Sequence, residues 1–290
     1  MPLIKIHALS DLHAEHFPEE EMAFRLAAVA DEVSSGNPDL IVLAGDIHQR
    51  NRGVKWAAEM LDPQQTGVPV VIIAGNHEFY SRDRYDKVIR QCRATAAQHE
   101  GIHFLDATGP IEGIRGVTTV EAAGLRISGT TLWTDARFGV RNPVDEVTVM
   151  MDLQAKMNDF KKIHFRDGTT FRKWKVNDMC KQHVREVEAL LAGAQSDIVV
   201  THHLPHPEGI SPGHATSDVN AAYVTNLTDV IHRINAPLWI HGHSHGARNY
   251  HVGDTRIVNV SRGYPGEETS RFTEIVFEPG RGVTSVEHLR

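Results

Sequence analysis

The chain has 290 residues, of which 41% are hydrophobic and 23% charged, a composition typical of a soluble globular protein with a sizeable core. A formal net charge of -7 argues against a broad positive surface for nucleic acid or an anionic membrane. The two cysteines, Cys92 and Cys180, are far apart in sequence, which argues against a disulfide framework and favours a reducing compartment.

Short apolar runs that end in polar residues recur along the chain, and each is typical of a buried strand. They lie at Leu3–Leu9, Leu40–Ala44, Val68–Ala74, Ile198–Thr201 and Leu238–Ile240. Helical patterns, with apolar residues three and four apart, lie around the first three runs, at Glu20–Ser34, Gly53–Leu61 and Arg84–His99. Together with the strand-rich segments Gly116–Thr131 and Arg256–Phe277, this alternation predicts packed sheets with helices outside. The first run leaves no room for a secretory signal and none is long enough to span a bilayer, so we expect a cytoplasmic protein.

Residues 134–182 break this pattern, because the loop-like segment Phe138–Pro143 is followed by two partly amphipathic helical stretches. We interpret residues 134–182 as a small inserted helical cap within a single domain that covers residues 1–290. Part of the cap, residues 156–175, is basic and contains Lys156, Lys161, Lys162, Arg166, Arg172, Lys173 and Lys175. This basic segment is either a solvated helical face or a cap surface that attracts the phosphate of a substrate.

Five short polar motifs each follow an apolar run. They are Asp11-Leu12-His13, Gly45-Asp46, Gly75-Asn76-His77-Glu78, Thr201-His202-His203 and His241-Gly242-His243-Ser244-His245. Taken alone, each motif has an ordinary explanation as a turn, a helix cap or an exposed histidine. However, open α/β sheets bind their ligands at the carboxyl ends of strands, and residues two apart on an extended chain point to the same side. One site assembled from five strand ends therefore explains the motifs better than five coincidences, and its oxygen and nitrogen donors suit Mn, Fe, Zn or Co.

In order and spacing, the five motifs resemble the signature of the calcineurin-like metallophosphoesterase superfamily. Asn259–Glu267 is similar to a segment that follows the last motif in many bacterial members. The resemblance implies an α/β fold, a four-layer α-β-β-α sandwich of two mixed β-sheets flanked by helices. It also implies two transition-metal ions, one bound by Asp11, His13 and His245, the other by Asn76, His202 and His243, with Asp46 bridging them. His202 is favoured over its neighbour His203 because the first residue that leaves the strand usually points inward in this family, but the doublet keeps both open.

The implied activity is hydrolysis of a phosphoester. Two cations roughly 3.5 to 4 Å apart can bind a bridging water, lower its pKa and clamp the oxygens of an in-line attack on phosphorus. His77, which is not a ligand, would then protonate the leaving group. The segment Gly45–Arg50 lacks the second aspartate and the final glycine of the protein Ser/Thr phosphatase motif, so we expect a small-molecule phosphodiester or phosphomonoester, with phosphodiesterase activity favoured over protein phosphatase activity. Residues close to these motifs are candidates for substrate binding: His48, Arg50, Tyr80, His206, Arg262 and Tyr264.

Two other functions remain as alternatives at this stage. A nuclease of the same superfamily is disfavoured by the acidic balance of the chain, although the basic segment at residues 156–175 prevents its exclusion. A non-catalytic scaffold with this fold would normally have lost metal ligands, whereas every ligand position of the family matches here. The sequence does not determine which metals bind or how many chains associate.

Overall fold

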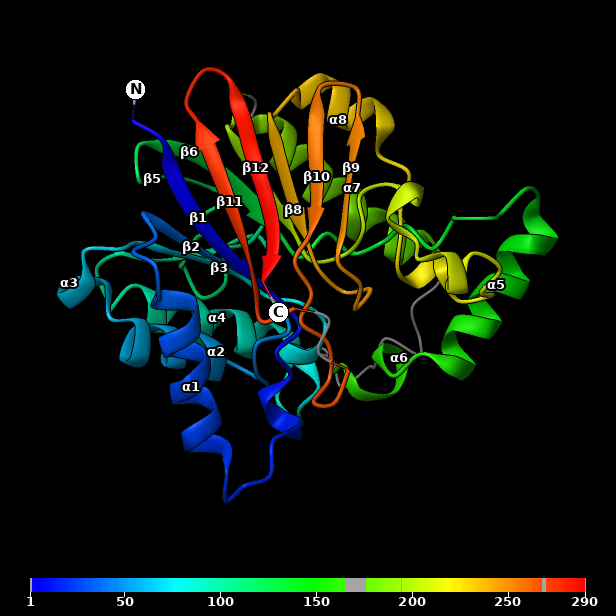
Figure 1. The fold of residues 1–290 in the computed structure, drawn as a ribbon. Coiled ribbons are helices and arrows are strands. Elements are labelled where there is room, and N and C mark those ends of the chain that lie inside the picture. The colour runs from blue at the N-terminus through cyan, green and yellow to red at the C-terminus, as the bar shows by residue number, and fades with distance from the viewer. Residues whose placement is uncertain (1, 165–175, 194, 268–269, 290) are drawn as a thin grey trace.

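The first sheet combines the N-terminal strands with a C-terminal hairpin (Figure 1). The computed structural model describes residues 2–164, 176–193, 195–267 and 270–289. Within them, the strand order of this sheet is β12-β11-β1-β2-β3-β4. Its strands are β1 (Ile4–Leu9), β2 (Leu40–Ala44), β3 (Val70–Ile73), β4 (Ile102–Leu105), β11 (Phe272–Glu278) and β12 (Gly282–Leu289). Strands β1 to β4 are parallel, so their carboxyl ends meet at one edge, whereas β11 and β12 are antiparallel to their neighbours β1 and β11.

The second sheet has the same mixed character, with the strand order β5-β6-β7-β8-β10-β9. Its strands are β5 (Thr119–Ala122), β6 (Leu125–Thr130), β7 (Ile198–Thr201), β8 (Leu238–His241), β9 (Arg248–Val252) and β10 (Thr255–Asn259). The four inner strands are parallel, and β5 and β9 run antiparallel at the two edges. All five of the predicted buried strands are present, and both sheets are mixed as expected.

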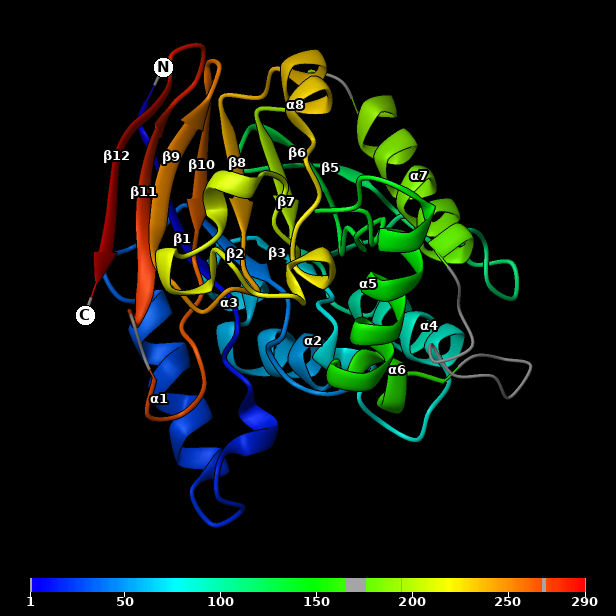
Figure 2. The same ribbon diagram turned by 90° about the vertical axis from the view of Figure 1, so that its right-hand side faces the viewer.

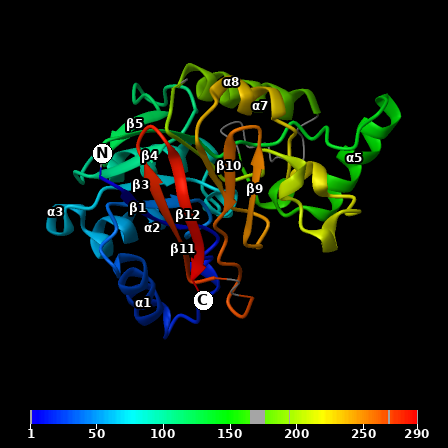
Figure 3. The ribbon, with the colours of Figure 1, turned by 45° about the horizontal axis from the view of Figure 1, so that its top comes forward.

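Helices cover the outer faces of the two sheets, which gives the predicted four layers (Figure 3). The helices α1 (Met22–Ser34), α2 (Arg52–Trp56), α3 (Pro63–Thr66) and α4 (Tyr85–Ala96) follow strands of the first sheet, and α7 (Val176–Ala192) and α8 (Thr228–Ile234) lie on the second. The inner faces of the sheets pack together through a buried cluster that includes Val42 and Val71 from one sheet and Val200 and Ile240 from the other. Because these strands are covered on both faces, they read as continuous apolar runs in the sequence.

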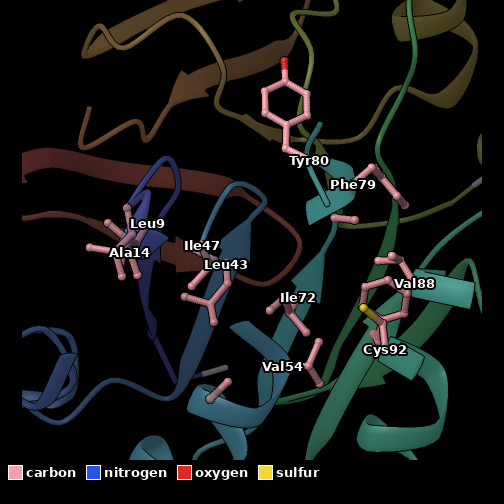
Figure 4. Close-up of a cluster of buried hydrophobic side chains, with 14 of the residues drawn as sticks. Leu9, Ala14, Leu43, Ile47, Val54, Ile72, Phe79, Tyr80, Val88 and Cys92 are labelled. Carbon is pink, nitrogen blue, oxygen red and sulfur yellow. The ribbon is translucent and has the colours of Figure 1, made fainter. Parts of the chain in front are cut away.

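A second buried cluster joins the outer face of the first sheet to its helices (Figure 4). Leu43 of β2 and Ile72 of β3 belong to this cluster, as do Val54 of α2 and Val88 of α4. Figure 4 shows Tyr80 at the rim of the cluster with its hydroxyl pointing away from the other labelled side chains. This packing fixes the loops that follow β1, β2 and β3, which carry three of the five polar motifs.

The predicted cap contains α5 (Pro143–Lys156) and α6 (Asp159–Lys162), which lie to one side of the sheets (Figures 1 and 2). Asn142 caps the start of helix α5, because its Oδ1 accepts hydrogen bonds from two backbone N–H groups of the first turn. Proline, which is favoured at the first helical position, follows Asn142. The predicted boundary at residue 182 falls inside α7, which continues to Ala192 and packs against β6. Residues 165–175 of the basic segment lie outside the described residues.

Smaller differences from the sequence analysis lie at element ends. The helix predicted over Gly53–Leu61 is α2 followed by a π-helical turn at Ala57–Leu61. The strand predicted over Val68–Ala74 is shorter in the structure. It is β3, which covers only the residues that pair with β2 and β4. In the described ranges, no helix is both long and apolar enough to cross a membrane.

Candidate metal centre

Asp11, His13 and His245 converge from two different strand ends. Asp11 and His13 follow β1, His245 lies in the loop after β8, and one ligand atom from each lies within 4.8 Å of the others. The Nε2 atoms of His13 and His245 face each other at 3.0 Å, and Asp11 Oδ1 is 3.5 Å from His245 Nε2. Two imidazole nitrogens and a carboxylate oxygen thus surround a single point, an arrangement suited to a transition-metal ion.

Asp46, His202 and His243 form a second group of the same kind, with ligand atoms again within 4.8 Å of one another. His202 Nε2 is 3.3 Å from Asp46 Oδ2 and 3.2 Å from Asn76 Oδ1, so the Asn76 amide oxygen also faces this group. The other ring nitrogen of His202, Nδ1, donates to the Ala44 carbonyl at 2.9 Å, which leaves Nε2 as the ligand atom.

The neighbouring His203 lies beside this second group but is oriented differently. Its Nδ1 contacts the Thr131 carbonyl oxygen at 3.3 Å, and its ring packs against the rings of Trp133 and His243. Of the two histidines in the doublet, His202 is therefore the one whose ring nitrogen faces Asp46 and Asn76.

Asp46 lies between the two groups. Its Oδ2 is 3.3 Å from His202 Nε2 in one group and 3.8 Å from His13 Nε2 in the other. Its other oxygen, Oδ1, accepts a hydrogen bond of 2.8 Å from the backbone N–H of His77. The carboxylate is thus held in place and presents one oxygen toward both clusters.

The backbone at this edge of the sheet is unusually close-packed. A Cβ at Gly75 would overlap Asp46 Oδ1 and lie 2.7 Å from His202 Nε2, so only glycine fits between them. The buried carboxylate of Glu78 accepts hydrogen bonds from the backbone N–H groups of Asp46, Ile47 and Gly75 at 2.8 to 3.1 Å. Glu78 thereby ties the loop after β2 to the loop after β3.

Burial and the neighbouring charges together shift the pKa values of the site residues. Desolvation would raise the pKa of Asp46, but the neighbouring His202 and His77 rings outweigh it and hold that pKa well below its usual range. Desolvation also opposes the charged form of His202, yet Asp46 raises its pKa to about 10. Burial together with the His203 and His202 rings lowers the pKa of His243 well below its ordinary value. The Asp46 carboxylate and the neutral His243 ring are thus in the protonation states that metal ligands require, whereas His202 would have to release its proton when a metal ion binds.

The second group also fits a metal ion by an independent observation. His243 Nε2 is buried and has no hydrogen-bond partner in the described structure, although it faces the group that contains Asp46 and His202. An unpaired buried ring nitrogen is destabilising unless it binds something. Without cysteine, and with both nitrogen and oxygen donors, the set suits Mn, Fe or Zn better than calcium or a soft metal.

His77 lies beside the metal ligands but presents its two ring nitrogens to other groups. Nδ1 donates to Glu15 Oε1 at 2.7 Å, and Nε2 is 3.5 Å from the Tyr264 hydroxyl. Burial lowers the pKa of His77, but Asp46 and Glu15 outweigh it, so the pKa is raised above the ordinary value. The ring is thus oriented by Glu15 and favoured in its protonated form.

A cavity of about 560 Å³ opens next to these residues. His13, Asp46, Asn76, His77, His243 and His245 line its floor. The other lining residues come from the segment after β3, from the cap, from the loops after β7 and β8 and from the loop between β10 and β11, and include Tyr80, Lys156, Met157, Ile210, Asn220, Tyr223 and Tyr264. A substrate of small-molecule size therefore has direct access to both ligand groups.

Two of the six candidate substrate contacts, Tyr80 and Tyr264, line the cavity. The other four lie apart from its described lining. Arg50 pairs with Asp83 at 2.5 Å and Arg262 with Glu32 at 2.9 Å. His48 is buried and its Nδ1 accepts from the Gln49 N–H, and His206 caps the short 3₁₀ helix Pro207–Gly209. A role for these four residues in substrate binding thus stays a prediction.

Three residues of the site escaped the sequence analysis. Glu15 contacts His77 and His13, Glu267 contacts His245 Nδ1 at 3.1 Å, and Asp159 of α6 accepts hydrogen bonds from Asn76 and Tyr80. Glu15 could have been suspected from its place two residues after His13. Glu267 ends the Asn259–Glu267 segment, which the sequence analysis had noted without giving Glu267 a role, whereas Asp159 had no signal because it comes from the cap.

The chain matches one protein family over most of its length and one curated relative over a shorter segment. The model of a family described as calcineurin-like phosphoesterase matches residues 4–247. Among curated proteins, an acyl-carrier-protein phosphodiesterase of Mycobacterium tuberculosis is 27% identical over 95 residues, which cover 29% of this chain and 27% of the relative. The match thus spans about a quarter of the length of that relative.

Solved structures share the fold over nearly the whole chain. The phosphopantetheinyl hydrolase from Mycobacterium tuberculosis has a TM-score of 0.61 and 22% identity, with 92% of this chain and 94% of that chain covered. A dimetal phosphatase from Danio rerio has a TM-score of 0.56 and 13% identity, with 95% and 96% covered. At these identities the likeness concerns the architecture, and the chemistry must be argued from the residues.

Proposed function

The chain belongs to the calcineurin-like phosphoesterase family, whose members are metal-dependent phosphoester hydrolases, and we propose that it uses two metal ions to hydrolyse a small phosphodiester. One ion would be held by Asp11, His13 and His245, the other by Asn76, His202 and His243, and Asp46 would bridge them. The observation that carries this proposal is the pair of ligand groups on either side of one buried carboxylate. When bound, two such ions supply positive charge to the phosphoryl oxygens and activate water for the attack.

His77 would act as the general acid. Nε2 faces the cavity and Tyr264, while Nδ1 is held by Glu15, so the ring can deliver a proton to a leaving oxygen without turning. The raised pKa of His77, caused by Asp46 and Glu15 against the effect of burial, keeps that proton available near neutrality. Glu15 would thus be a positioning residue for His77.

The charges around the cavity favour a phosphodiester over a phosphomonoester. A monoester carries up to two negative charges and a diester one, so a monoesterase gains from a cationic side chain near the phosphate. Among the described lining residues, Lys156 is the one lysine or arginine, and it pairs with Asp152 and Asp218. Arg50, one of the candidate substrate contacts, pairs with Asp83. The name of the curated relative, a phosphodiesterase, agrees with this class.

The apolar part of the cavity wall suits the organic portion of such a substrate. Met157, Ile210, Val219 and Tyr223 also line the cavity, so an uncharged organic group can bury apolar surface against them. A long nucleic acid would need several cations along its backbone, which the described cavity does not offer. A small molecule therefore fits best.

A direct comparison of substrates tests the proposal. With Mn²⁺ supplied, we expect faster hydrolysis of bis(p-nitrophenyl) phosphate than of p-nitrophenyl phosphate, and loss of activity in Asp46→Asn. His77→Ala should lower kcat by about 10² to 10⁴-fold with unchanged metal content, because it removes an acid rather than a ligand. His251→Ala, which removes an exposed histidine of β9, is the matched control. A monoester preference would refute the substrate class, and full activity in Asp46→Asn would refute the two-metal mechanism.

A further inference from the structure

Glu15, His16 and His77 converge on one point just outside the two ligand groups. Glu15 and His16 belong to the 3₁₀ helix Ala14–His16 after β1, and His77 starts the 3₁₀ helix His77–Phe79 after β3. Glu15 Oε1 is 2.7 Å from His77 Nδ1 and 3.8 Å from His16 Nε2. One ligand atom from each of these residues and from His13 lies within 4.8 Å of the others. Three residues from two separate loops therefore surround a third point with the chemistry of metal ligands.

The Glu15 carboxylate presents Oε1 to this third point, while its second oxygen, Oε2, lies on the side of His48. Its side chain is only 7% exposed, and Oε2 is buried with no hydrogen-bond partner in the described structure. The ring nitrogen Nδ1 of His48 lies 3.8 Å from that oxygen, beyond hydrogen-bond distance. A buried anionic oxygen without a partner is destabilising, so a cation bound to this carboxylate would be stabilised.

The donor atoms of Glu15, His16 and His77 are those that Zn²⁺ prefers. Two imidazoles and one carboxylate form a common ligand set for Zn²⁺ in open sites, where water completes the tetrahedron. The His16 side chain is 50% exposed, so an ion can reach the site directly from solvent.

We propose that Glu15, His16 and His77 bind an inhibitory Zn²⁺ ion when zinc exceeds the two equivalents of the catalytic centre. The inhibitory effect rests on the proposed function, because the ion occupies His77 Nδ1 and the proton held there is released to solvent. Glu15 then binds the ion instead of orienting the protonated ring. The His77 ring is left without the positive charge that makes it an acid, and turnover falls while the two catalytic ions stay in place.

His16 is the residue to change, since it contacts the third point without belonging to the catalytic machinery. The protein is loaded with two equivalents of Zn²⁺, freed from excess metal and then titrated with Zn²⁺ while bound metal is counted after equilibrium dialysis. We expect a third equivalent in the wild type and a parallel loss of phosphodiesterase activity. His16→Ala should keep two equivalents and full basal activity, lose the third equivalent and need at least tenfold more zinc for half inhibition. His251→Ala is again the control and should titrate like the wild type.

Two results would overturn the inhibitory site: no third equivalent in the wild type up to millimolar zinc, or a third equivalent that persists unchanged in His16→Ala. The binding count separates this inference from the proposed function. If His77→Ala keeps full activity but loses the third equivalent, the site is correct and the role of His77 as an acid is wrong. If His77→Ala is inactive and the wild type still binds only two equivalents, the acid role stands and the inhibitory site is refuted.

Discussion

Asp159 is the residue through which the cap should control the affinity of one metal ion. Its Oδ1 accepts hydrogen bonds from Asn76 Nδ2 at 2.9 Å and from the Tyr80 hydroxyl at 2.7 Å, and Asn76 Nδ2 also donates to Tyr80 at 3.0 Å. Asp159 and Tyr80 both accept from the Asn76 amide nitrogen, which fixes the orientation of the amide group. The Asn76 amide oxygen therefore points at the second ligand group, where it is 3.2 Å from His202 Nε2. We therefore expect Asp159→Ala to weaken the binding of the ion held by Asn76, and not of the other.

The size of the effect follows from these contacts. A hydrogen bond to a charged acceptor contributes about 1.5 to 3 kcal/mol, and the remaining contact between Asn76 and Tyr80 retains part of the orientation. Loss of a residue that orients a ligand typically lowers metal affinity about 10 to 100-fold, which corresponds to about 1.4 to 2.7 kcal/mol. Asp159→Asn keeps one acceptor oxygen without the charge and should lie between the wild type and Asp159→Ala.

Equilibrium dialysis against graded free Mn²⁺, with metal counted per chain, resolves the two sites. The expected result is one unchanged and one weakened equivalent, with activity that follows the weakened one. Asp145→Asn, which changes another carboxylate of the cap, on α5, is the matched control. The reasoning is refuted if Asp159→Ala binds both ions with wild-type affinity, or if both equivalents weaken together while the protein stays folded.

Three further predictions concern other parts of the fold. Burial raises the pKa of Glu186 to about 8 against hydrogen bonds from Trp133 and Thr130, so between about pH 4.5 and 8 the folded state holds a proton that the unfolded state lacks. The free energy of unfolding should thus fall as pH rises through this window, by at most about 1.4 kcal/mol per pH unit, and urea unfolding should show a flatter profile for Glu186→Gln. Gly242→Ala places a Cβ over Ser10 Oγ and 2.6 Å from Asp11 Oδ2, so metal analysis should show loss of the ion bound by Asp11 in a chain that is still folded by circular dichroism. Removal of metal with a chelator should lower Tm, and calorimetry should show recovery with added Mn²⁺, since each ion present at 100 times its Kd stabilises the folded state by about 2.7 kcal/mol.

The sequence predicted the fold well where burial leaves a simple pattern. Strands β2 and β7 agree with their predicted ends because both faces of each strand are covered, which requires an uninterrupted apolar run. The end of the cap could not be predicted, since α7 has one face on β6 and its amphipathic pattern continues smoothly across residue 182. A helix that continues through a predicted boundary leaves no break in its pattern of apolar and polar residues.

The metal site was predictable to a different degree for each kind of residue. Ligands such as Asp11 and His202 follow buried strands directly, so the strand pattern locates them in space. Asp159 could not be found in this way, because its contact with Asn76 depends on where the cap folds back over the sheet edge. Arg50 shows the converse, a position matched by resemblance whose side chain is drawn away from the cavity by Asp83. Local spacing thus locates the proposed ligands at neighbouring strand ends, while the residues that contact and orient them depend on tertiary contacts.

The backbone conformation of the proposed ligands explains how side chains that follow different strands point at one place. Five of the proposed ligands have left-handed backbone conformations, with φ between 45° and 73°: Asp11, His13, Asp46, His243 and His245. Such conformations cost a non-glycine residue about 1 to 3 kcal/mol each and persist only where surrounding contacts impose them. Here the contacts cross between loops, since the Asp11 N–H donates to Gly45, the His13 N–H to Asp46, and the His243 N–H to the Asp11 carboxylate. These bonds join the loops after β1, β2 and β8 to one another, and they fix the directions in which the five side chains point.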